Sequence, residues 1–178
     1  MFKIMDNLFS LGIFLGLMTQ PIFNLLGIYT GDQAISYYSM VHQSKLNSII
    51  HTIGMPFTYY GLLLCVPPLF VRGRKNIGDL QCFFYSYFIT YYLSMDVLVG
   101  VIVAICYFPS QEFAMKHMMI SESVLKTALY GLGVATLALT IQEVFGHWLC
   151  GDPPSRIEGI PNAIWHAGYY SIWHLTRG

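Results

Sequence analysis

The sequence predicts an all-α membrane protein, a polytopic helical bundle of about five or six helices. Three observations lead to this fold class. Only 10% of the 178 residues are charged, against about 25% in an ordinary soluble domain. The hydrophobic share is 55% and the mean hydropathy is +0.54. Several apolar runs also reach the length of about 20 residues that a membrane-spanning helix needs.

The first apolar run is Leu8–Ile28, which follows a single lysine near the N-terminus. A cleaved signal peptide would end in a small-residue cleavage site, and this segment has none, so we expect an uncleaved membrane helix. Gly12 and Gly16 form a GxxxG pattern, which can let two helices approach closely.

More apolar runs follow along the chain, separated by polar segments that we expect to be turns. The long runs are Ser48–Val71, Cys82–Phe108 and Val124–Leu149, and a shorter, more aromatic run covers Ile160–Leu175. The polar segments read "TGDQ", "RGRKNIGD", "PSQEFAMKH" and "GDPPSRIEG". No repeat or linker divides the sequence, so we expect a single transmembrane domain over residues 1–178.

Composition and motifs exclude several classes of function. The net charge is zero and the pI is near 7, so nothing suggests nucleic-acid binding, which would call for a basic patch. The sequence contains no GxGxxG or GxxxxGK[ST] phosphate loop, no GxSxG nucleophile elbow and no HExxH zinc motif. The four cysteines are scattered without a CxxC pair, which predicts neither a disulfide framework nor a cysteine zinc site.

Two histidines, His42 and His51, lie at the start of an otherwise apolar run. On one continuous helix they would be about 13.5 Å apart along the axis and on nearly opposite faces. The segment between them is polar, however, and includes Asn47, a residue type that favours helix N-caps. If one helix ends near His42 and the next begins at Asn47, the imidazoles can converge on a metal ion. The alternative is that both histidines only satisfy helix ends.

A second polar cluster occurs in "IQEVFGHWLCGDPPSR". Glu143 and His147 are four residues apart and share a helix face. A carboxylate beside an imidazole is typical of a pair of metal ligands, or of a ligand and the residue that orients it. Asp152 follows just after the expected helix end. The alternative is a salt bridge with Arg156 at that end.

The remaining histidines are less informative. His166 and His174 are about 12 Å apart along a straight helix, so at most one of them binds the same ion. The aromatic residues around them also fit an interfacial belt. His117 falls in a polar segment, and we expect a surface residue there.

The pattern Y-x4-H-x4-N-x3-H-x4-P, formed by Tyr37, His42, Asn47, His51 and Pro56, resembles the first motif of the membrane-bound 2-hydroxy fatty acid dioxygenases. A Gly-His pair near the end of a late helix, here Gly146 and His147, resembles their second motif. The resemblance covers residues 37–178, and residues 1–30 look like an added N-terminal helix.

The resemblance implies an Fe(II) site in the endoplasmic-reticulum membrane. Its expected metal ligands are His42, His51 and His147, with His174 as a fourth chosen by position. Its expected catalytic residues are Tyr37, Glu143 and Asp152.

The implied reaction uses dioxygen to cleave the C1–C2 bond of a long-chain 2-hydroxy fatty acid, as in the α-oxidation that follows phytosphingosine breakdown. Such an acid can chelate Fe(II) through its carboxylate and hydroxyl groups. Nitrogen ligands suit iron as well as zinc. Two alternatives are therefore another histidine–metal membrane enzyme, such as a zinc hydrolase, and a non-catalytic membrane protein.

The chain departs from the family pattern in the second motif. Glu143 stands where the family has glutamine, with Gln142 one place away. Asp152 takes the place of a closer glutamate, and His174 aligns with a glutamate.

A shared ion also constrains the topology. His51 begins the run Ser48–Val71 and His147 ends the run Val124–Leu149, so three simple spans would leave them on opposite sides of the membrane. One run must therefore be something other than a single crossing. Cys82–Phe108 is too long for one straight span and contains Asp96, so we expect two helices there, with a turn near Asp96 at a membrane surface.

Overall fold

The computed structural model describes residues 2–26, 31–153 and 160–177, and these residues are helical almost throughout, with no strand among them. This confirms the all-α prediction. The long helices, each of 18 residues or more, are α1 (Phe2–Leu25), α3 (Lys45–Cys65), α5 (Arg74–Met95), α6 (Val97–Ile120), α7 (Val124–Ile141) and α8 (Ile160–Arg177). The shorter elements are α2 (Gly31–Val41), α4 (Pro67–Phe70) and a π-helical turn, Gln142–Trp148, that continues α7.

The protein is a membrane protein by the length and composition of its helices. Within the described residues, four segments are long and apolar enough to cross a bilayer: Asn7–Leu25, Lys45–Phe70, Val97–Ile120 and Val124–Trp148. Large apolar side chains on these segments face outward, such as Phe14 at 58% exposed and Ile105 at 68%. A soluble protein rarely exposes contiguous apolar surface of this extent, so lipid is the solvent that fits it.

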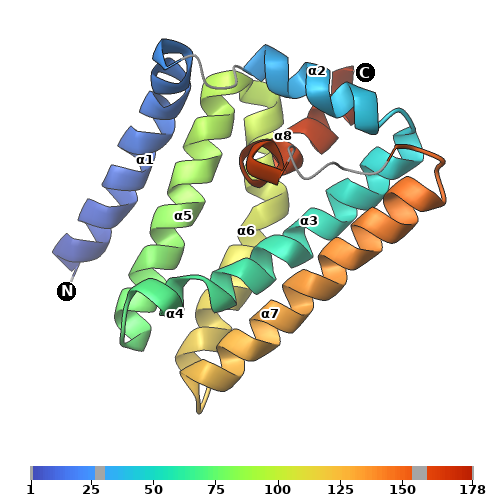
Figure 1. Ribbon diagram of the computed structural model, residues 1–178. Coiled ribbons are helices and arrows are strands. Elements are labelled where there is room, and N and C mark those ends of the chain that lie inside the picture. The colour runs from blue at the N-terminus through green and yellow to red at the C-terminus, as the bar shows by residue number, and fades with distance from the viewer. Residues whose placement is uncertain (1, 27–30, 154–159, 178) are drawn as a thin grey trace.

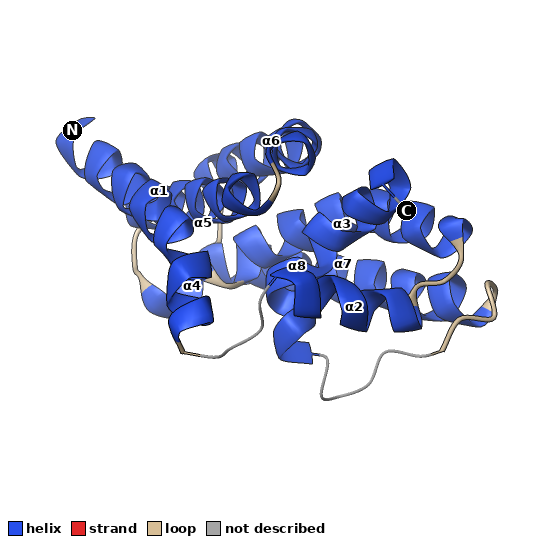
Figure 2. Ribbon diagram, turned by 90° about the horizontal axis from the view of Figure 1, so that it is seen from above, coloured by secondary structure: helices blue, strands red, loops and turns tan. Residues whose placement is uncertain are grey.

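The helices pair in two close contacts (Figures 1 and 2). In both views α1 lies along α5 and α3 lies along α7, while α2 and α8 lie across one end of the bundle. Glycines permit both close approaches. A Cβ at Gly16 would lie 2.5 Å from the carbonyl oxygen of Tyr87, and one at Gly61 would lie 2.5 Å from that of Gly131. The GxxxG pattern of the first helix therefore faces α5.

The expected helical hairpin is confirmed. α5 ends at Met95, α6 begins at Val97, and Asp96 is the residue between them. Its Oδ1 accepts a hydrogen bond of 3.1 Å from the backbone N–H of Val99, so Asp96 is the N-cap of α6. Its Oδ2 lies 2.7 Å from the Arg177 guanidinium at the end of α8. Because the chain reverses here, the start of α3 and the end of α7 lie at the same end of the bundle (Figure 1).

Two of the polar segments expected to be turns are mostly helical. α5 begins at Arg74, inside "RGRKNIGD", and a Lys75–Asp79 ion pair of 2.7 Å lies along its first turns. α6 continues through Pro109 and the whole of "PSQEFAMKH". Of "TGDQ", residues 31–33 begin α2 and Thr30 lies outside the described residues, as does most of "GDPPSRIEG". Polarity at these positions reflects the first turns of α5 and the last turns of α6 rather than chain reversal.

His117 is accordingly not a loop residue. It lies in the last turn of α6, half-buried, with its Nδ1 2.6 Å from the hydroxyl of Tyr60 on α3. The expectation of a plain surface residue was wrong because the polar segment around His117 is helical and packs against α3.

Replacing Asp96 tests the hairpin. Asp96→Ala removes both the N-cap and the ion pair, whereas Asp96→Asn retains an N-cap residue. We expect Asp96→Ala to lower the free energy of unfolding by about 0.5–2 kcal/mol, and Asp96→Asn to lower it by less, since a partly exposed ion pair contributes little. Thermal or denaturant unfolding in detergent measures both. Equal stability of Asp96→Ala and the wild type would contradict the capping role.

Candidate metal centre

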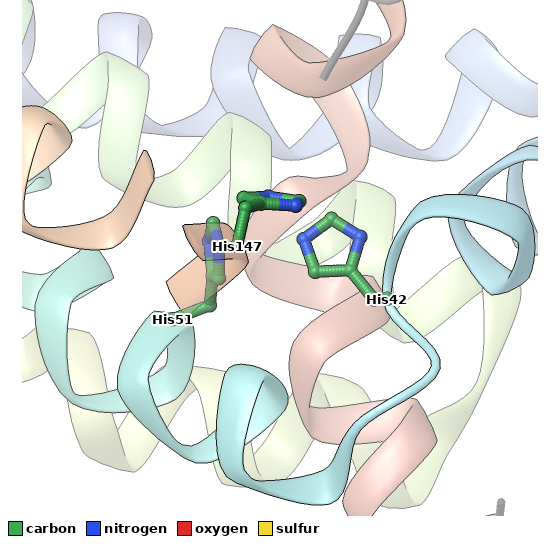
Figure 3. A group of neighbouring side chains, drawn as sticks. All are labelled: His42, His51 and His147. Carbon is green, nitrogen blue, oxygen red and sulfur yellow. The ribbon is translucent and has the colours of Figure 1, made fainter. Parts of the chain in front are cut away.

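Three buried histidines converge at one end of the bundle (Figure 3). His42, His51 and His147 each offer a ring nitrogen, and these atoms all lie within 4.8 Å of one another. The ring centroids are 4.6 Å apart for His42–His51, 4.8 Å for His42–His147 and 5.4 Å for His51–His147. Nitrogens that share one ion at about 2.1 Å lie at most about 4 Å apart. Small side-chain movements therefore suffice to close the three rings around an ion.

A break between helices brings His42 and His51 together. α2 ends at Val41, His42 begins a three-residue connection, and α3 starts at Lys45. The expected break is confirmed, but the N-cap is Ser44, whose Oγ accepts a hydrogen bond of 3.2 Å from the Leu46 N–H. The chain thus turns immediately after His42.

Asn47 is buried and has a different role from the expected N-cap. Its amide Nδ2 donates a 2.7 Å hydrogen bond to Oδ2 of Asp152. The same oxygen accepts a 3.1 Å bond from the backbone N–H of Ser44. Asp152 therefore holds the loop after the π-helical turn against the start of α3.

His147 lies in the π-helical turn that continues α7. Its carbonyl oxygen accepts a 3.0 Å hydrogen bond from the N–H of Asp152, which closes this end of the turn. Gly146 lies directly against α3, since a Cβ there would be 2.5 Å from Oδ1 of Asn47 and 3.2 Å from Nε2 of His51. The glycine of the Gly-His pair is thus required by close approach to the other ligand candidates.

The hydrogen bonds of the described residues leave several ring nitrogens of the cluster unbonded. Neither ring nitrogen of His42, nor Nε2 of His51, has a hydrogen-bond partner among the described residues. The Nδ1 of His147 is 2.7 Å from the carbonyl oxygen of Pro153. Since a carbonyl only accepts, Nδ1 carries the proton and Nε2 carries the lone pair, which is the tautomer that a metal ligand at Nε2 needs.

Burial keeps His42 neutral. Loss of solvation, the largest cause, and the neighbouring His51 and His147 together lower the pKa of the His42 imidazole from 6.5 to about 2. A neutral imidazole offers a lone pair, so His42 is available to a cation throughout the physiological pH range. His42 is therefore suited to bind a positive ion and unsuited to hold a proton.

The other predicted site residues differ in their surroundings. Glu143 is half-exposed, with Oε2 3.8 Å from Nε2 of His147. Tyr37 has a buried hydroxyl without a hydrogen-bond partner among the described residues, and its ring packs edge-on against Tyr38. Whether Glu143, Asp152 or Tyr37 acts in catalysis stays a prediction.

His174 is not part of the group of three. Its Nδ1 lies 3.3 Å from the hydroxyl of Tyr170 on α8. His166, the other candidate on this helix, has its Nε2 2.6 Å from the hydroxyl of Tyr91. The structure thus places a phenol against each imidazole of α8 and brings neither into the cluster.

Two neighbours of the site had no role in the sequence prediction. Gln142 is 1% exposed, and its amide donates to the Thr58 hydroxyl at 2.9 Å and to the Ala138 carbonyl at 3.0 Å. Tyr38 packs its ring on His42, with 5.0 Å between centroids. The role of Gln142 could have been predicted from the sequence, because it lies one residue from the position of the family glutamine. Nothing in the sequence indicated that Tyr38, and not Tyr37, packs against His42.

No protein-family model, curated protein or solved structure matches this chain.

Gly146 provides a test of the site's geometry. Gly146→Ala forces a methyl group against Asn47 and His51, so we expect weaker metal binding, measured by titration with a metal ion. Gly133→Ala is the matched control, because Gly133 lies upstream in α7 and a Cβ there meets nothing within 4 Å. Unchanged metal affinity in Gly146→Ala would contradict the close approach.

We expect Glu143 and Asp152 to orient the ligands of the ion and not to be essential ligands themselves. Removing such a residue typically lowers metal affinity or activity by about 10–100-fold. We expect losses of this order for Asp152→Ala and smaller ones for Glu143→Gln, both measured by metal titration. Complete loss of metal in Glu143→Gln would make Glu143 an essential ligand and overturn this expectation.

Proposed function

We propose that this protein is an Fe(II)-dependent dioxygenase that cleaves the C1–C2 bond of long-chain 2-hydroxy fatty acids in the endoplasmic-reticulum membrane. One observation carries the proposal. The histidines of the Y-x4-H-x4-N-x3-H and Gly-His motifs, far apart in the sequence, offer ring nitrogens within 4.8 Å of one another.

The donor set fits iron. His42 and His51 have buried ring nitrogens without hydrogen-bond partners among the described residues, and burying such groups is costly unless something binds them. Imidazole nitrogens are suitable ligands for iron, copper, nickel and zinc. Three ligands also leave coordination positions for a substrate and for dioxygen. When bound, iron would supply the activation of dioxygen.

The arrangement of Gln142 supports the resemblance to the dioxygenases. The family has its glutamine four residues before the histidine, and here the spacing is five. A π-helical turn takes up one extra residue because its hydrogen bonds run from i to i+5. Gln142 is consequently buried beside α3 while Glu143 is half-exposed. The departure at Glu143 is then a shift by one residue and not the loss of the glutamine.

The proposed reaction balances without an external reductant. A 2-hydroxy acid and one dioxygen contain the atoms of a fatty acid one carbon shorter, one carbon dioxide and one water. The four electrons that dioxygen accepts all come from C1 and C2 of the substrate. The protein's contribution is to bind the polar head beside His42, His51 and His147 and to exclude water from it.

The surroundings of the cluster suit a long-chain amphiphile. The three histidines lie at one end of helices that are long and apolar enough to span a bilayer. A polar head at this end can reach the cluster while the acyl chain stays among apolar side chains. The endoplasmic reticulum is the location implied by the resemblance.

A zinc hydrolase is the second candidate, and Glu143 favours it. Its carboxylate lies 3.8 Å from Nε2 of His147, within one water molecule's reach of an ion at the cluster, where a carboxylate could activate that water. The two candidates differ in the metal that copurifies and in the requirement for oxygen.

Single substitutions of the histidines test the proposal. We expect His42→Ala, His51→Ala and His147→Ala each to abolish metal binding or activity, and His117→Ala to do neither, because His117 bonds Tyr60 away from the cluster. Elemental analysis of the purified protein identifies the metal. The activity assay is the oxygen-dependent loss of one carbon from a 2-hydroxy fatty acid. Stoichiometric zinc with oxygen-independent hydrolysis would replace the dioxygenase by the hydrolase, and full activity in a mutant would remove that residue from the site.

A further inference from the structure

Two buried hydroxyls on α3, next to the histidine cluster, have no hydrogen-bond partner among the described residues. Ser48 is 0% exposed, and neither its Oγ nor the buried Oγ1 of Thr52 makes a hydrogen bond there. Ser48 precedes His51 by three residues and Thr52 follows it directly, near the start of α3. Leaving a buried polar group unpaired is costly. Two such groups beside one candidate metal ligand therefore point to something that binds both.

Hydroxyls elsewhere in the bundle are satisfied within their own helix. Thr19, Thr90 and Ser171 each donate to the carbonyl oxygen four residues earlier, at 2.7, 2.6 and 2.9 Å. This bond to the preceding turn is a common solution for serine and threonine inside helices. Ser48 and Thr52 each follow such a carbonyl by four residues and do not bond to it. Their hydroxyl protons are therefore available to an acceptor outside α3.

The two hydroxyls lie on the face of α3 that is turned into the bundle. At about 100° per residue, Ser48 lies between His51 and Thr52 around the helix axis, and the three side chains share an arc of about 100°. Met55 continues this face by one turn and packs against the core cluster that contains Tyr38 of α2. The hydroxyls therefore face the protein interior on the side of α3 that carries the metal-ligand candidate.

The unused groups are hydrogen-bond donors, so their ligand must be an acceptor. A serine or threonine hydroxyl has one proton to donate, and an ionised carboxylate only accepts. Residues four apart on a helix have Cβ atoms about 5–6 Å apart, so the Ser48 and Thr52 hydroxyls can both donate to one carboxylate at about 2.7 Å. Hydrogen bonds to an ionised acceptor are also about twice as strong as those between neutral groups. A carboxylate therefore satisfies this pair better than a neutral acceptor does.

We propose that the Ser48 and Thr52 hydroxyls bind the carboxylate of a long-chain 2-hydroxy fatty acid at the histidine cluster. The inference rests on the proposed function, which supplies the acid and the ion that neutralises its charge. The two residues hold the polar head on the side of α3 that carries His51. They also determine specificity, because an ester or an alcohol of the same chain length lacks the ionised acceptor that both hydroxyls need.

Ser48→Ala and Thr52→Val remove the two hydroxyls with little change of volume. Neither hydroxyl has a partner among the described residues, so we expect no loss of stability, and removing an unsatisfied polar group can even stabilise the protein. Thr52→Ser keeps a hydroxyl at the second position. The matched control is Thr90→Val on α5, whose hydroxyl already donates to the Ser86 carbonyl at 2.6 Å.

The experiment measures the binding of radiolabelled 2-hydroxyhexadecanoic acid, and of its methyl ester, to the full-length, iron-loaded protein in detergent. Oxygen is excluded, so that no turnover consumes the ligand. The ratio of the two affinities reports on the carboxylate alone, because the acyl chain and the 2-hydroxyl group are the same in both ligands. Iron content, circular dichroism and thermal unfolding are measured for every variant.

We expect the wild type to bind the acid more tightly than the ester. Ser48→Ala and Thr52→Val should each weaken binding of the acid by about 10-fold, the loss expected for one hydrogen bond to a charged group. Both should bind the ester with unchanged affinity and unfold at the wild-type temperature or above it. Thr52→Ser and Thr90→Val should keep the wild-type ratio of affinities.

The outcomes separate this carboxylate site from the proposed function. A wild-type ratio in both Ser48→Ala and Thr52→Val, with iron bound, would overturn the site and leave the dioxygenase standing. Equal binding of acid and ester by the wild type would do the same, as would variants that lose stability but no affinity, the result expected if the hydroxyls bind only buried water. A wild-type protein that binds no iron, or binds iron but no 2-hydroxy acid, would remove both proposals. If one variant failed to fold, the other would decide by the same ratio.

Discussion

The carboxylate of Asp152 makes the contacts on which the cluster of three histidines depends. It accepts hydrogen bonds from Ser44 and Asn47, which are more than 100 residues away in the sequence. Ser44 caps α3 and follows His42 by two residues, Asn47 precedes His51 by about one helical turn, and Asp152 closes the turn that carries the third histidine. Hydrogen bonds to a charged group contribute about 1.5–3 kcal/mol each. A single side chain therefore fixes the relative positions of three chain segments, none of which could build the cluster by itself.

The main geometry of the centre could be predicted because it follows from chain direction. His51 at the start of α3 and His147 at the end of α7 can meet because four long helices, an even number, lead from one to the other: α3, α5, α6 and α7. The reversal at Asp96 could be predicted from the length of one apolar run and from the cost of placing an acid within the bilayer. That prediction required only that His51 and His147 meet. The break after His42 was predictable for a similar reason, since the polar residues before Asn47 interrupt the apolar pattern.

Finer details could not be predicted because several residues satisfied the same rule. Ser44 and Asn47 are both residue types that favour N-caps. Ser44 is the N-cap of α3, whereas the Asn47 side chain donates its hydrogen bond to Asp152. Polar residues near the ends of long helices look like loops in a sequence, which misplaced His117. The choice of His174 as a ligand rested on position alone, and the packing of Tyr170 against it determines where its ring lies. No pattern of residue types indicated the π-helical turn.

That turn has a consequence for how this chain tolerates changes of length. Because its hydrogen bonds run from i to i+5, the turn contains one residue more between Gln142 and His147 than an α-helix would need. Removing a single residue such as Val144 lets the segment rewind as a regular helix, and both ends can keep their places against α3. A deletion in the straight part of α7 would instead rotate every later side chain by about 100°, unless the extra residue were drawn upstream to compensate. The segment next to the histidine cluster can thus lose one residue and keep the cluster's surroundings in place, whereas the same deletion would misalign most other helices.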